Sequence, residues 1–336
     1  MTAVAETVGV GANPLRDWLR RHGWTFGVWL LLGALVAWYS TLVPSFGGFE
    51  LSLIINNSLP IAFLALAQAV IVIAGGIDLG VGSMMVLTNV VAAKYMEGES
   101  LIIALVIAVI LIAAAAVLNG LVGLIINVSK VPDIVITLAT LFIFAGFALA
   151  ILPSPGGGAP GRFRWLFTGS ELGIGSNPWP AIVMLAVFTH AVGLWLVKTR
   201  TGLSLYALGS DATAAYLSGV RNAKAKVVSY ALGGALAAMS GLATTALTGS
   251  GSPRLSIAST ATLNSVAAIV LGGIALTGGI GSVVGASAAA IALFILNPIL
   301  TARGVDPNNA RVIQGLLIIF VLMIAGVLEQ RRQRRT

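Results

Sequence analysis

The chain has 336 residues, of which 58% are hydrophobic and only 9% carry a charge. A soluble domain carries about a quarter charged residues, so water is not the main solvent of this chain. The formal net charge of +8 does not indicate a nucleic-acid-binding protein, because Lys and Arg stand in short tracts between apolar runs.

Apolar runs near the roughly 20 residues needed to cross a bilayer recur along the chain. Residues 1–24 precede the first run and show no cleavage site, so the first span is expected to remain uncleaved. The sequence predicts an all-α polytopic membrane protein, with residues 25–328 as one transmembrane domain and a basic tail at 329–336. About ten helices are expected, near residues 25–43, 51–74, 80–95, 101–127, 133–152, 179–197, 227–248, 262–277, 282–300 and 312–328.

The distribution of positive charge predicts the orientation of these helices. An even number of spans places both termini on one side, and on this placement about 13 Lys and Arg lie on that side against about 6 on the other. Cytoplasmic loops carry the excess of Lys and Arg. Both termini and the polar loop 198–226 are therefore expected in the cytoplasm. The Gly- and Pro-rich loop 153–178 is expected outside, either as a surface for a soluble partner or as a plain connector.

The segment "GGIDLGVGSMM" interrupts an apolar stretch with four glycines and a carboxylate. Such a break is tolerated in a membrane only where the freed backbone is buried in protein or lines a watery cavity. We expect Asp78 to cap a helix that begins at Leu79, and direct contact with a solute is the alternative. The hinge or pathway candidates in this segment are Gly75, Gly76, Asp78, Gly82 and Ser83.

A second segment, "LGGIALTGGIGSVVG", interrupts the apolar sequence at 271–285. The spacing of Gly281 and Gly285 favours close helix packing, and a hinge or a constriction of the pore is the alternative. Residues 71–83 and 268–282 are similar to each other, which indicates either an internal repeat or the ease with which Gly-rich apolar sequence matches itself. The candidates here are Gly272, Gly273, Gly278, Gly279 and Gly281.

Polar, uncharged side chains recur inside the expected spans. Each of them prefers an interior partner to lipid, either a solute or another helix. A lining of this kind suits a neutral hydroxylated solute better than an ion. The candidates are Asn56, Asn57, Gln68, Asn89, Asn119, Thr137, Thr140, Asn264 and Gln314.

The sequence offers little to an enzyme. It has no G-x-x-x-x-G-K-[ST] segment to cradle ATP phosphates and no cysteine for a disulfide, a thiolate metal site or a nucleophile. Its two histidines, His22 and His190, stand alone without a metal-ligand spacing. No metal and no cofactor are expected on this chain.

Four blocks resemble the ribose-type permeases of bacterial ABC importers, in order and in spacing, from about residue 50 to the C-terminus. They are "QAVIVIAGGIDLGVGSMM", "VPDIVITLATL", "GLSLYALGSDATAAYLSGV" and "LGGIALTGGIGSVVG". The resemblance implies a type II importer fold in the inner membrane. It also implies a second permease, identical or related, two cytoplasmic ATPases that use ATP and magnesium, and a periplasmic sugar-binding protein.

The loop 198–226 resembles the coupling segment of these permeases, whose pattern is Glu-Ala-Ala, three residues, then Gly. Thr213 stands in place of the Glu, and Ala214, Ala215 and Gly219 match. A short helix outside the bilayer can dock in a groove on a partner, with Asp211 favouring its start and Gly219 ending it. A charged residue at Ala215 is expected to clash with that partner. The alternative is a solvated connector.

Together these features predict a permease that imports a neutral sugar by alternating access. One alternative is a branched-chain amino-acid permease of a related ABC branch, although a zwitterion favours fixed charges and Asp78 is the intramembrane acid found here. The other is an ion-coupled secondary transporter.

Overall fold

A computed structural model describes residues 14–306, 308–310, 312–316, 319–320 and 323, with side chains from residue 23 onward. These residues form helices and contain no β-strand, which confirms the predicted all-α class. The elements are α1 (Pro14–Leu42), α2 (Gly48–Ile73), α3 (Val81–Met96), α4 (Leu101–Ser129), α5 (Asp133–Ile151), α6 (Gly161–Thr168), α7 (Trp179–Lys198), α8 (Arg200–Ser210), α9 (Ala212–Leu217), α10 (Asn222–Thr248), α11 (Leu255–Leu271) and α12 (Val283–Ala302).

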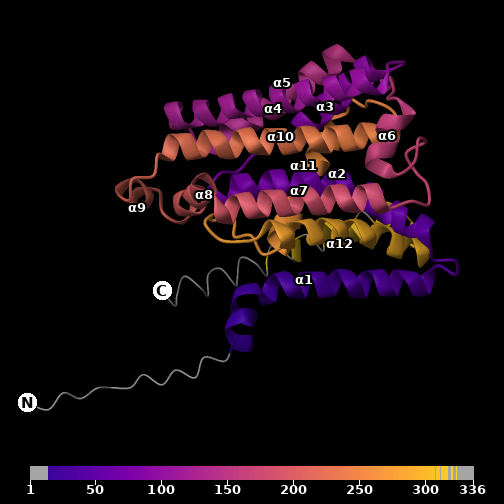
Figure 1. The fold of residues 1–336 in the computed structure, drawn as a ribbon, viewed down its shortest axis with the longest axis horizontal. Coiled ribbons are helices and arrows are strands. Elements are labelled where there is room, and N and C mark those ends of the chain that lie inside the picture. Colours follow the sequence, from indigo (N-terminus) through magenta and orange to yellow (C-terminus); the bar gives the residue numbers. More distant parts are fainter. Residues whose placement is uncertain (1–13, 307, 311, 317–318, 321–322, 324–336) are drawn as a thin grey trace, which may run out of the picture.

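The long helices lie alongside one another in a bundle around α2 (Figure 1). In the membrane-length window of α2, 83% of residues are buried, against 17% in those of α1, α4 and α5. The difference in burial follows from composition. Helix α4 is almost wholly aliphatic and suits lipid, whereas α2 carries Asn, Gln and Pro residues that need protein around them.

Seven helices within the described ranges are long and apolar enough to cross a membrane. Two further apolar helices, α3 and α11, have 16 and 17 residues, and at about 1.5 Å per residue they fall short of a hydrocarbon core of about 30 Å. Nine of the ten predicted helices are present near their expected positions. Most of the tenth, at 312–328, and the basic tail 329–336 lie outside the described residues.

Four predicted boundaries were wrong. Helix α1 begins at Pro14, inside the predicted N-terminal segment, although its membrane-length part, Gly23–Leu42, matches the predicted span. Helix α10 begins at Asn222 rather than at 227, and α11 runs from Leu255 to Leu271 rather than from 262 to 277. The added turns are rich in polar residues, so hydropathy does not mark them, although their backbone is helical.

The two ends of the bundle differ. Figure 1 shows α8 and α9 at one end, where α1 also begins, and α6 at the other. Arg164 of α6 fixes this second end through two hydrogen bonds. Its Nε donates to the carbonyl of Ala246 at 2.9 Å, and its Nη2 donates to the carbonyl of Leu172 at 2.6 Å. The loop 153–178 is therefore fixed to the end of α10, and its role as a partner surface or a connector stays a prediction.

We predict that the two ends face opposite sides of the membrane, with α8 and α9 inside. The exposed Leu172 and Ser218 mark the two ends, and the chain has no native cysteine. In intact cells, an impermeant thiol reagent is expected to label Leu172→Cys and to label Ser218→Cys only after permeabilisation. Ala69→Cys, buried in α2, serves as the unlabelled control. Labelling of both exposed positions from outside would contradict the orientation.

Candidate functional site

The segment after α7 folds into two short helices, α8 and α9. Asp211 stands between them, and its Oδ1 accepts the backbone N–H groups of Thr213 at 2.8 Å and Ala214 at 2.9 Å, as expected of an N-cap. Gly219 follows α9 with a φ of +85°, which an L side chain rarely adopts. The short helix predicted here is therefore present, with the expected start and stop.

The exposed face of α9 is apolar. Tyr216 and Leu217 are 70% and 80% exposed, which is unusual for large apolar side chains next to polar loop residues. Ala215, in contrast, is buried against its own chain. A charged residue at Ala215 would therefore disturb the packing of α9 itself, and the expected clash with a partner stays a prediction. Thr213 and Ala214 are exposed.

The first interrupted stretch joins α2 to α3. Helix α2 ends in a Schellman motif: Gly75 has a φ of +75° and donates to Val72 O at 2.9 Å, and Gly76 donates to Ile71 O at 3.0 Å. Helix α3 begins at Val81 with Gly80 as its N-cap, rather than at Leu79 with Asp78 as the cap. Asp78 is thus not the capping residue itself.

Asp78 still supports the start of α3. Its Oδ1 accepts the backbone N–H of Gly80 at 2.7 Å, while the buried Oδ2 has no partner. Gly82 and Ser83 lie in the first turn of α3 rather than in the break. Gly82 N–H donates to Thr262 Oγ1 of α11 at 3.1 Å, and Ser83 Oγ donates to Gly80 O at 2.7 Å.

A polar cluster surrounds this break. Lys226 of α10 forms an ion pair of 2.7 Å with Asp133 at the start of α5, and Tyr230 OH donates to Asp133 Oδ2 at 2.8 Å. Tyr230 OH and Thr137 Oγ1 each also lie 3.3 Å from Ile77 O. The cluster therefore ties the starts of α5 and α10 to the break. A carboxylate in the first turn of a helix is also favoured by the helix dipole.

The second interrupted stretch begins in the same way as the first. Gly273 has a φ of +89° and donates to Val270 O at 3.0 Å, and Ile274 donates to Ile269 O at 2.9 Å. This is the Schellman geometry found at Gly75. The two similar stretches therefore share this backbone structure at their starts, and an internal repeat stays a prediction.

The remaining residues of this stretch form tight turns before α12. Gly278, Gly279 and Gly281 all have positive φ. Gly272 and Gly285 face each other, and a Cβ on Gly285 would collide with the Gly272 carbonyl oxygen. Small residues thus let the end of α11 approach the start of α12. The close pair is Gly272 with Gly285 rather than the predicted Gly281 with Gly285, because Gly281 lies in the turn before α12.

Several polar residues inside the spans bond to other parts of the chain. Asn56 Nδ2 donates to Ser52 Oγ and Thr168 O, both at 2.9 Å, and Asn57 donates within α2. Asn89 reaches α10 and the turn after it. The Thr140 hydroxyl donates to Thr137 O and the Asn297 amide to Gln314. These contacts support the alternative in which the polar side chains bond to protein, within and between helices, rather than to a solute.

Three other candidates form no side-chain hydrogen bond within the part of the chain that the structure describes. Gln68, at the centre of α2, is fully buried, and neither its Oε1 nor its Nε2 has a partner. Asn119 is buried with its Nδ2 unpaired, and Asn264 is half-exposed on α11. Because an unpaired buried amide is costly, Gln68 and Asn119 are the stronger candidates for contact with water or solute. The roles assigned to all these residues in the pathway stay predictions.

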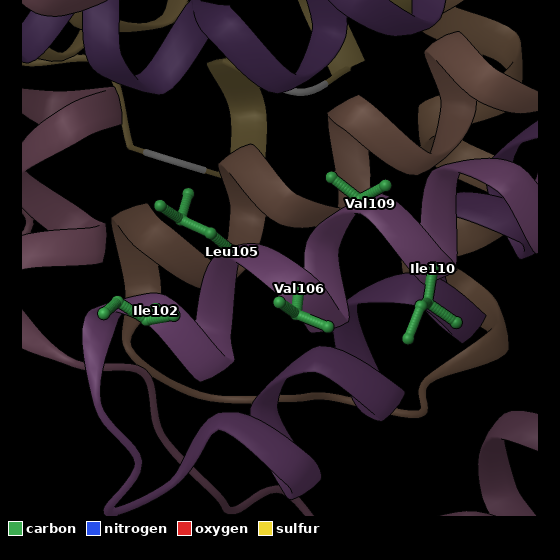
Figure 2. A pocket seen from close by; sticks show the side chains of 5 residues that line it. All are labelled: Ile102, Leu105, Val106, Val109 and Ile110. Carbon is green, nitrogen blue, oxygen red and sulfur yellow. The ribbon is translucent and has the colours of Figure 1, made fainter.

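One surface hollow lies along α4 and is lined by Ile102, Leu105, Val106, Val109 and Ile110 (Figure 2). All five side chains are aliphatic and come from a helix whose outer face is exposed. The hollow offers no donor or acceptor to a polar solute. Its aliphatic lining suits lipid acyl chains.

Five residues that organise the site are not among the predicted candidates. They are Asp133, Lys226 and Tyr230 of the polar cluster, and Tyr206 and Gly209 of α8, which contact the interrupted stretches. One signal was available, because Asp133 and Lys226 are charges at the ends of apolar runs. Their pairing depends on residues 93 positions apart.

The fold is a bundle of membrane-length helices with polar interior side chains, two interrupted stretches and an exposed pair of helices at one end. Together these features are those of a membrane permease. The chain belongs to the family described as "Branched-chain amino acid transport system / permease component", which matches residues 50–322. It is thus a multi-pass permease of the ABC importer class in the bacterial inner membrane. This membership excludes the ion-coupled alternative.

Curated relatives agree with this family. The chain is 33% identical to the ribose import permease protein RbsC of Bacillus subtilis, over 89% of this chain and 91% of that protein. It is 30% identical to RbsC of Escherichia coli K12, over 88% and 91%. It is 28% identical to the autoinducer 2 import system permease protein LsrD of Escherichia coli O9:H4, over 93% and 95%. No solved structure matches the chain.

Proposed function

We propose that this chain is the permease subunit of an ABC importer for a neutral, polyhydroxylated solute of the pentose or hexose kind. The observation that carries the proposal is its likeness to ribose import permeases along nearly the whole chain. A relative named as a fructose import permease, FruG of Bifidobacterium longum, supports the same class of solute.

The chemistry of the bundle favours a neutral solute over a zwitterion. Interior candidates such as Gln68 and Asn119 offer amides, which can donate to and accept from sugar hydroxyls. Within the described ranges one ion pair is present, Lys226 with Asp133, and it lies at an end of the bundle. An amino acid would need a cation and an anion placed along its path.

The exposed ends suit different partners. In this proposal, α8 and α9 form the coupling segment and present Tyr216 and Leu217 to a cytoplasmic ATPase. The ordered outer loop with α6 receives a periplasmic binding protein. Two such permeases, identical or related, enclose the path, and ATP-driven movement of α8 and α9 opens it alternately to the two sides.

The chain itself takes no part in ATP chemistry in this proposal. It has no P-loop to hold phosphates, so ATP and magnesium belong to the partner ATPase. It binds no cofactor of its own.

A reconstituted complex tests the proposal. The purified chain alone is expected neither to bind nor to hydrolyse ATP, because it lacks the backbone cradle that phosphates require. When it is assembled with its partner ATPase and binding protein, one sugar from a panel of pentoses and hexoses is expected to stimulate hydrolysis and to be taken up. Stimulation by leucine or valine instead would favour the amino-acid alternative. ATP hydrolysis by the chain alone would contradict the assignment.

A further inference from the structure

The last turn of α8 lies against both interrupted stretches. A Cβ on Gly209 would collide with the carbonyl oxygen of Ile73, where α2 ends, and would lie 2.6 Å from the backbone N of Gly279. A Cβ on Gly278 would in turn lie 2.9 Å from Gly75 Cα and 3.0 Å from Gly209 Cα. Backbone therefore meets backbone from three segments, with no side chain between them.

Two hydrogen bonds close this glycine junction, which consists of Gly75, Gly209, Gly278 and Gly279. Gly279 N–H donates to Ile73 O at 2.9 Å and joins the second stretch to the end of α2. Tyr206 OH of α8 donates to Gly281 O at 3.0 Å, one residue before the cap of α12. Burial raises the pKa of Tyr206 above its ordinary value, so the hydroxyl keeps the proton that it donates.

We infer that the glycine junction transmits movement of α8 and α9 to both interrupted stretches at once, with Gly209 as the positioning residue. This inference rests on the proposed coupling function of α8 and α9. No side chain lies between the three segments, so none can change rotamer to absorb a displacement of α8. Close-packed backbone therefore moves together.

The glycine junction contacts segments that lead to several membrane helices. It holds the end of α2, the most buried of the membrane-length helices described, and the turn that leads into α12. Beyond the first stretch lies α3, and beyond the second lies α12. One displacement of α8 therefore acts on helices from both of the similar stretches together.

The test uses the complete complex of permease, ATPase and binding protein. Gly209→Ala adds one methyl group at the junction and leaves the exposed face of α9 unchanged. We expect sugar-stimulated ATP hydrolysis and uptake to fall about tenfold, the size of a typical coupling between sites. Retention of the ATPase and unstimulated hydrolysis are expected to stay as in the native complex. Ser204→Ala is the matched control, because its hydroxyl bonds only to Thr201 O within α8.

A second readout follows the transmission itself. Leu276 is 44% exposed in the second stretch, so Leu276→Cys is expected to react with a thiol reagent at a rate that changes when ATP and magnesium are added. In the Gly209→Ala background that change is expected to disappear. A structural defect alone would alter the rate without removing its response to ATP.

The outcomes separate the inference from the proposed function. A native complex without ATP-dependent uptake would refute the proposed function, and the inference would fall with it. A native complex that transports, together with a Gly209→Ala complex that transports equally well, would refute the inference alone.

If Gly209→Ala does not accumulate, Tyr206→Phe tests the inference instead. It removes one hydrogen bond and no packing, and we expect stimulated hydrolysis to fall about fivefold. Full stimulation in that variant would overturn the inference.

Discussion

Leu217→Glu is expected to release the ATPase from the permease and to abolish uptake. Burial of a Leu side chain in a partner groove contributes about 1.5–3 kcal/mol, and a carboxylate in the same groove costs several kcal/mol more. A loss of about 3 kcal/mol weakens binding more than 100-fold. Since Leu217 is 80% exposed in the free chain, the substitution leaves folding within about 0.5 kcal/mol.

Co-purification of the ATPase with the permease tests this prediction directly. A tag on the permease retains the ATPase in the native complex, and the retained amount is compared in Leu217→Glu. The control is Leu172→Glu, the same substitution at a residue with 81% exposure at the opposite end of the bundle. It is expected to retain the ATPase and its unstimulated hydrolysis in full. If both variants retain the ATPase equally and Leu217→Glu still transports, α9 is not the docking element.

Gly82→Leu is expected to prevent the permease from accumulating in the membrane. At this position α3 crosses α11, and a Cβ would collide with the carbonyl oxygen of Ala258 and with Thr262 Oγ1. A backbone carbonyl in a helix cannot rotate away, so the two helices must separate. Overpacking of this kind costs about 1–3 kcal/mol or more, and here it also breaks the Gly82–Thr262 hydrogen bond.

The matched control lies on α5. A Cβ on Gly146 would meet no atom within 4 Å, and the residue is exposed on a membrane-length helix. Gly146→Leu is therefore expected to accumulate normally, since it adds an apolar side chain on an outer face and improves helix propensity by about 1 kcal/mol. Quantitative blotting of membrane fractions measures both variants. Normal accumulation of Gly82→Leu would mean that α3 and α11 do not pack as closely as described.

Two classes of prediction followed from local sequence. The positions of the membrane helices were predictable, because crossing a bilayer requires a run of apolar residues, and each run is a property of its own segment. The ends of α9 were also predictable, because Asp211 bonds to backbone groups two and three residues away and Gly219 supplies its own left-handed conformation.

The polar turns of the helices were less predictable. The start of α11 at Leu255 and the whole of α6 carry Ser, Thr or Arg residues that hydropathy assigns to loops. Their helical state depends on contacts elsewhere, as Arg164 of α6 shows by bonding to carbonyls at the end of α10. Such bonds join residues 82 positions apart.

Which candidates lie together depends on contacts between distant segments. That Gly75 and Gly278 interrupt apolar stretches follows from the sequence, since a glycine in such a run is visible without any partner. The sequence does not show that Gly209 of the polar loop lies between them, that Ala215 faces inward, or that Gln68 has no partner while Asn89 has several. The physical reason is that burial and hydrogen-bond partners belong to pairs of segments distant in the chain, which only the packing of the helices brings together.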